Sequence, residues 1–138
     1  HTRVDHSSPH TSSSEIYHGV LNGHARGVFN GKIIVHKGSQ KTDAHLSNEN
    51  LLLSNDAEVD TKPELEIYAD DVKCTHGATI GPLDEKGLFY LRSRGLNRKE
   101  AQQILMRAYV NEIIENVSDE KIRSELMELI LDRLPKGG

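Results

Sequence analysis

The local pattern of the chain changes at Gly81-Pro82. Up to Gly81, short apolar segments rich in β-branched residues alternate with Gly, Asn, Asp, Ser and Thr. This pattern predicts many short strands separated by tight turns, and no segment there keeps a helical period over three turns. After Pro82 the apolar residues recur at helical spacing. The sequence therefore predicts a β portion over residues 1–81 and a helical domain over residues 82–138.

The composition narrows the kind of core that the β portion can have. Apolar residues make up 36% of the chain and aromatic residues 4%, with no Trp. Such a chain favours a thin, repetitive architecture filled by Val, Ile, Leu and Ala. The net charge is −4 without a basic cluster, so we expect no nucleic-acid partner. No run of about 18 apolar residues is present, so we expect no membrane span.

The topology of the β portion stays open at this level. Asn22-Gly23 and Asn30-Gly31 are the dipeptides of tight hairpin turns, which would suit an antiparallel sandwich. The longer polar runs "KGSQKTDAHLSNEN" and "SNDAEVDTKPE" would instead suit the corners of a parallel β-helix, in which equivalent strands stack from coil to coil. Spacing alone does not separate the two architectures.

Three helices are expected after Pro82. The first covers "LDEKGLFYLRSRGL" and stops at Gly95. The second begins at Asn97, which forms a capping-box pattern with Glu100, and runs to about Asn116. Ser118 is expected to cap the third, which Pro135 ends. The predicted apolar stripes are Ala101, Ile104, Leu105, Ala108, Tyr109 and Ile113 on the second helix and Ile122, Leu126, Leu129, Ile130 and Leu134 on the third.

Most titratable residues carry no chemical pattern. The histidines other than His76 lack metal-ligand spacing and are expected on the surface or in turns. Asp70 and Asp71 are adjacent, so in a strand they would point to opposite faces, and a solvated turn is the better interpretation. A single cysteine makes no internal disulfide, which favours a reducing compartment such as the cytosol or an organelle matrix.

The segment "VKCTHGATI" contains the candidate site. Strand alternation would place Val72, Cys74, His76, Ala78 and Ile80 on one face. The simple interpretation is a buried cysteine beside a core histidine. The functional interpretation is a soft-donor pair for zinc, copper or iron, and its remaining ligands would have to come from another chain or from sulfide.

Several longer segments carry a family resemblance. "KTDA", "AEVDTKPELEIYADDVKCTHGATIG", "FYLRSRGL" and "RLP" resemble the SufB/SufD family of the SUF iron–sulfur cluster assembly system, and the SufD branch more than the SufB branch. The resemblance spans residues 17–135. It implies the last coils of a right-handed parallel β-helix followed by a C-terminal helical domain. It also implies a non-catalytic scaffold subunit, located in the cytoplasm or in a plastid stroma.

The resemblance also implies partners and site residues. The chain would pair with SufB at the end of the β-helix and bind the SufC ATPase through Phe89, Tyr90, Arg92, Arg94 and Leu96. His76, and with weaker support Cys74, would lie at the SufB–SufD interface and handle a transient Fe–S cluster, with no cofactor held stably by this chain alone. The alternatives are a carbohydrate-active β-helix enzyme and a bare oligomerisation module that forms a homodimer.

Overall fold

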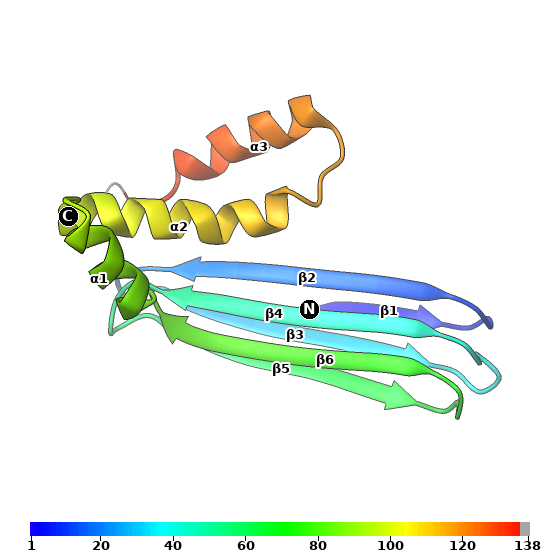
Figure 1. The fold of residues 1–138 in the computed structure, drawn as a ribbon. Helices are drawn as coiled ribbons and strands as arrows, with labels where there is room; N and C mark the ends of the chain where they lie inside the picture. The colour runs from blue at the N-terminus through cyan, green and yellow to red at the C-terminus, as the bar shows by residue number, and fades with distance from the viewer. Residues whose placement is uncertain (136–138) are drawn as a thin grey trace. The chain divides into compact units, whose positions relative to one another are not determined.

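The computed structural model describes residues 1–135. The chain divides into two compact units between Gly81 and Pro82. Within the described residues the first unit is built from six strands and the second from three helices (Figure 1). The strands are β1 (Thr2–His6), β2 (Ser12–Leu21), β3 (Arg26–Val35), β4 (Asp43–Leu52), β5 (Glu58–Ile67) and β6 (Lys73–Pro82).

Consecutive strands of the first unit belong to different sheets. One sheet has the order β1-β3-β5 and the other the order β2-β4-β6, so every second strand returns to the same sheet (Figure 1). The pairs β1–β3, β2–β4 and β3–β5 are parallel, and their registers begin at Thr2 with Gly31, Ser12 with Asp43 and Arg26 with Glu58. The coil length is therefore nearly constant along the chain, although the sequence shows no sharp repeat.

The hairpins suggested by the two Asn-Gly dipeptides are wrong. Gly23 does turn the chain, with φ +64°, but it joins β2 to β3, which lie in different sheets. Asn30 and Gly31 lie inside β3. A side chain at Gly31 would meet the ring of Phe29, whose Cζ lies 2.7 Å from the place of a Cβ, so Phe29 would have to shift to admit it.

Aliphatic side chains form one part of the interior of the first unit. Tyr17 and Phe29 border it with their rings 4.8 Å apart. Because parallel strands bury one face in register, residues from separate coils stack on one another. The buried cluster consists of Ile33, Val35, Ala44, Leu46 and Ala69.

The helices of the second unit are α1 (Glu85–Ser93), α2 (Arg98–Ile114) and α3 (Glu120–Leu131). The predicted capping box is confirmed, because Asn97 accepts from the amide of Glu100 and the Glu100 carboxylate accepts from the amide of Asn97. The predicted third cap is wrong by one residue. Asp119, and not Ser118, is the N-cap, because its carboxylate accepts from the amide of Ile122, the third residue of the helix.

The predicted apolar stripes are only partly correct. On α2 the buried residues are Ala101, Met106, Val110 and Ile114, whereas Ile104 and Ala108 are exposed. The reason is that α2 contacts both α1 and α3, so it buries more than one stripe. On α3 no residue is fully buried, and Ile122 and Leu129 are half exposed.

Candidate functional site

The strand β6 carries the candidate site and stands at one end of its sheet. In the described residues the sheet order β2-β4-β6 leaves one side of β6 without a neighbouring strand. Its residue Cys74 packs against the buried cluster, next to Val72. On the opposite face, Thr75 contacts His45, with the hydroxyl 2.7 Å from Nδ1. From strand alternation we expect His76 on the same side of β6 as Cys74.

Burial along this face of β6 is uneven. Val72 and Cys74 are half buried, whereas His76, Ala78 and Ile80 are exposed. The apolar cluster thus ends at Cys74. A histidine satisfied in the core, which was the simple interpretation, does not describe His76.

The Cys74 thiol lies in an environment that favours its protonated form. Burial is the largest cause and raises its pKa, a hydrogen bond with the backbone of Ala44 lowers it, and the charge of Asp43 raises it further. A thiolate ligand or nucleophile needs the opposite environment, with nearby cations or a metal. Cys74 would therefore act as a donor only when a metal ion displaces its proton.

The described part of the chain does not complete a metal site. Among residues 1–135, no group of three or more His, Cys, Asp and Glu side chains gathers in a way that could hold a metal ion. The described chain therefore offers Cys74 and His76 as a pair of donors on one strand, which we call the half-site.

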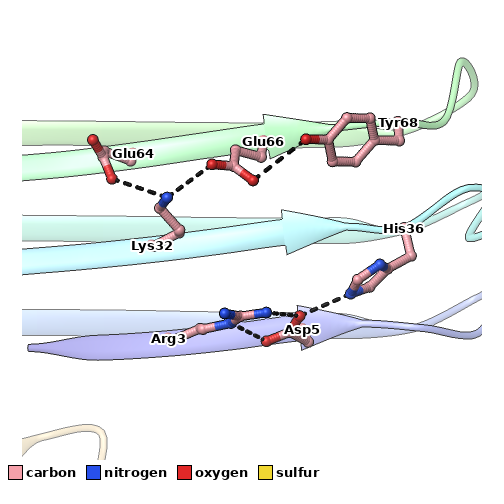
Figure 2. A network of polar contacts seen from close by, with 7 residues as sticks. All are labelled: Arg3, Asp5, Lys32, His36, Glu64, Glu66 and Tyr68. Carbon is pink, nitrogen blue, oxygen red and sulfur yellow. Dashed lines mark hydrogen bonds and ion pairs between the residues drawn. The ribbon is translucent and has the colours of Figure 1, made fainter.

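The outer face of the other sheet carries a polar network that the sequence analysis missed. Figure 2 shows its two clusters. In one, Asp5 accepts from Arg3 at 2.6 Å and lies 2.8 Å from His36 Nε2. In the other, Lys32 lies 2.8 Å from Glu66 and 3.4 Å from Glu64. A basic residue on β3 opposite acids on β5 was the available signal, but it becomes visible only once the register is known.

These contacts displace the pKa values of the exposed groups. The guanidinium of Arg3, and next the ring of His36, hold the pKa of Asp5 well below its usual range. Lys32 lowers the pKa of Glu66, and Lys62 together with Lys32 lowers that of Glu64. All these groups are open to solvent, so the network describes a charged sheet face and forms no enclosed catalytic pocket.

Two histidines depart from the expected surface or turn positions. His6 is 4% exposed, and its ring nitrogens lie 2.7 Å from the Thr11 hydroxyl and 2.9 Å from that of Ser13. The side chain of His18 is also largely covered and lies 3.8 Å from Glu49. Strand alternation turns His6 inward, whereas His18 is the register partner of Glu49 on the face of β4 opposite the interior, so alternation does not explain why His18 is covered. Asp70 and Asp71 are exposed in a bend, as predicted.

The helix α1 presents aromatic residues to solvent. Phe89 is 76% exposed and Tyr90 57%. The guanidinium of Arg94 lies 5.3 Å from the centre of the Tyr90 ring, and Arg92 is exposed in the last turn. Leu96 is half buried, so it contributes less to this surface than the sequence suggested.

Comparison with known proteins places these features in a family. Residues 1–109 match the family described as "SUF system FeS cluster assembly, SufBD core domain". The chain belongs to the SufB/SufD family. The match covers all six strands together with α1 and most of α2.

Relatives within the SufB/SufD family point to its SufD branch. The chain is 45% identical to the iron–sulfur cluster assembly protein SufD of Escherichia coli, over 99% of this chain and 32% of that protein. It is 38% identical to a SufBD family protein of Synechocystis, over 94% of the chain and 29% of the relative. The chloroplastic protein ABCI7 of Arabidopsis thaliana is 36% identical over 91% of the chain and 26% of its own length. The chain thus spans about a third of the length of these relatives.

Proposed function

We propose that this chain is part of a non-catalytic scaffold subunit for iron–sulfur cluster assembly by the SUF system. Its membership in the SufB/SufD family and the names of its relatives support the process. The half-site supports the role, because it supplies a thiol and an imidazole and leaves the remaining ligands to another chain. Iron and sulfide would be cargo of the complex, and the chain would work in the cytoplasm or in a plastid stroma.

The strand arrangement supports a β-helix as the frame of this scaffold. Successive strands alternate between two parallel sheets with nearly constant coil length. We interpret them as coils of a right-handed parallel β-helix that ends at β5 and β6. Edge strands have unpaired backbone groups, which another chain can bind. We therefore place the SufB contact at this end.

The half-site would act when the partner covers it. The exposed His76 imidazole can bind iron through a neutral ring nitrogen or exchange a proton with an incoming group. Cys74 can follow as a second ligand when a metal removes its proton. His76 is thus the primary residue and Cys74 the auxiliary one.

The exposed surface of α1 would bind the SufC ATPase. Phe89 and Tyr90 offer apolar area, and Arg94 extends over the ring of Tyr90 with its charge available to an acidic partner. Aromatic residues and arginine are enriched in protein interfaces. We assign Phe89 and Tyr90 the main contacts, with Arg92, Arg94 and Leu96 around them.

The test is anaerobic reconstitution of the complex with iron and sulfide, followed by absorption spectroscopy. His76→Ala should co-purify with SufB and SufC but form much less cluster, and Cys74→Ala should lose less. His24→Ala is the matched control, because the side chain of His24 is 88% exposed in the turn between β2 and β3. Normal cluster formation by His76→Ala would contradict the proposed role of the half-site in cluster assembly.

A second candidate function is homodimerisation of the chain through the same edges. Two copies could pair at β5 or β6 because both strands lack an outer neighbour in the described residues. Light scattering on the purified chain tests this candidate, and a monomer at every concentration would exclude it. A carbohydrate-active enzyme receives less support, since the acids on β5 are engaged with Arg26, Lys32 and Lys62.

A further inference from the structure

A polar cluster lies inside the first unit, between the two sheets. Asn48 is 3% exposed and Asn50 is 7% exposed, and both belong to β4. The carboxamide oxygen of Asn48 accepts two hydrogen bonds, one from Asn50 Nδ2 at 2.8 Å and one from the hydroxyl of Thr61 at 2.7 Å. Since Thr61 belongs to β5, this cluster connects the two sheets by side chains.

Neighbouring strands are shaped to accept the cluster. Gly19 is the register partner of Asn50 on β2, and a Cβ on Gly19 would lie 2.5 Å from Asn50 Oδ1. Asn50 Nδ2 also approaches the carbonyl oxygen of Thr79 on β6, at 3.4 Å. The carboxamide of Asn50 therefore fills the space that the missing side chain of Gly19 leaves.

Side-chain alternation and the outer ion pairs do not by themselves fix the register of β5. A slip by one residue would turn its apolar side chains to solvent, but a slip by two residues keeps every side chain on its original face. The outer ion pairs oppose such a slip only weakly, because Lys32 would keep Glu66 and Arg26 would keep Asp60, although Lys62 would then lie beside Arg26. Lys32 already contacts both Glu64 and Glu66, and Arg26 contacts both Glu58 and Asp60.

The polar cluster does distinguish the two registers. If β5 moved by two residues so that Ile67 took the place of Leu65 beside Ile33, Pro63 would take the place of Thr61. The side chain of Pro63 has no hydrogen-bond donor, so the buried oxygen of Asn48 would lose one of its bonds. Buried polar groups that are satisfied in one arrangement only are a known device for setting register.

We propose that Asn48, Asn50 and Thr61 form a register key that fixes the position of β5 in the first unit. The three side chains contribute specificity of strand stacking rather than stability. The key does not depend on the proposed role in cluster assembly. Its removal should therefore leave the unit folded but no longer confined to one strand register.

The test replaces the key by apolar residues of similar volume, as Asn48→Leu, Asn50→Leu and Thr61→Val together. We expect a thermal unfolding midpoint equal to or above that of the wild type, but a second set of amide peaks for β5 in nuclear magnetic resonance spectra. Nuclear Overhauser contacts should then join Ile33 to Ile67 as well as to Leu65. Ser47→Val is the control, because Ser47 lies on the opposite face of β4 and bonds to Glu49.

A single set of peaks with only the contact between Ile33 and Leu65 in the triple variant would overturn the proposal. If the triple variant does not fold, Thr61→Val decides alone. This variant removes one hydroxyl at nearly constant volume, so a second set of β5 amide peaks with contacts between Ile33 and Ile67 should appear in it and not in Ser47→Val. A single set of β5 peaks in Thr61→Val would also overturn the proposal.

Discussion

At the residue scale, the half-site combines one half-buried and one exposed donor. Cys74 belongs to the edge of the apolar cluster, whereas His76 is open to solvent two residues later. The sequence could place both on one face because a strand has a period of two. It could not tell that burial stops between them, because that depends on which residues of the other sheet lie opposite.

Alkylation of Cys74 tests its environment. Burial raises the pKa of the thiol, so the thiolate that reacts with iodoacetamide is scarce at neutral pH. We expect slower alkylation in the folded chain than in denaturant at about pH 7.5, and a rate that keeps rising above about pH 9. Equal rates in the folded and denatured chain would contradict this description of the cysteine.

Gly31→Ala tests the close contact inside β3. The new methyl group would lie 2.7 Å from Phe29 Cζ and 3.1 Å from Leu46 Cδ2, so we expect a loss of about 1–3 kcal/mol in the free energy of unfolding. Gly77→Ala is the control, because nothing lies within 4 Å of a Cβ at that position of β6. Urea titrations of both variants measure the difference, and a neutral Gly31→Ala would show that Phe29 can move away freely.

At the element scale, helix caps were the most predictable features. The pair Asn97 and Glu100 stands at fixed spacing, so a local rule was enough to find it. The cap of α3 was less certain because Ser118 and Asp119 are both good cap residues. Adjacent candidates differ only in which backbone geometry the preceding loop allows.

Substitution of the two cap candidates of α3 provides a direct comparison. Asp119→Ala should cost about 1 kcal/mol in unfolding free energy, because the amide of Ile122 loses its acceptor. Ser118→Ala should be close to neutral. The helical signal in circular dichroism during thermal unfolding reports both effects. A larger loss of unfolding free energy in Ser118→Ala than in Asp119→Ala would show that Ser118 is the N-cap, as the sequence predicted.

At the scale of the whole molecule, the charged face of β1-β3-β5 should make stability depend on pH. Asp5, Glu64 and Glu66 have pKa values below their usual ranges. Such groups stabilise the fold fully above their unfolded pKa of about 4, and this contribution is lost as the pH falls through the folded values. We expect unfolding free energy to fall below about pH 4, and to fall less at 1 M salt because exposed pairs are screened.

Lys32→Met tests the source of this dependence. The variant removes the cation that lowers the pKa of Glu66 and helps to lower that of Glu64, so the loss of stability in acid should be smaller than in the wild type. Lys37→Met is the matched control, because Lys37 lies exposed in a turn. Urea titrations at about pH 7 and about pH 3 measure the effect. Identical acid dependence in wild type and Lys32→Met would contradict the assignment.

The sequence by itself determined the change from strands to helices at Gly81-Pro82 and the capping box of α2, and strand alternation predicts Cys74 and His76 on one face. Each of these depends on residues close in the chain, whose geometry follows from local backbone preferences and periodicity. No helix in the described part of the chain is long and apolar enough to span a membrane.

Only the tertiary structure decided how distant segments meet. The dipeptide Asn30-Gly31 lies inside β3 and not in a turn, and α2 buries a different set of residues from the predicted stripe. Asn48 on β4 contacts Thr61 on β5. The tertiary structure also aligned the charges of β3 with those of β5. These features depend on register and packing between segments that are distant in the chain, and hydrophobic alternation alone is unchanged by a two-residue slip. These features could therefore be recognised only once it was known which distant residues are in contact.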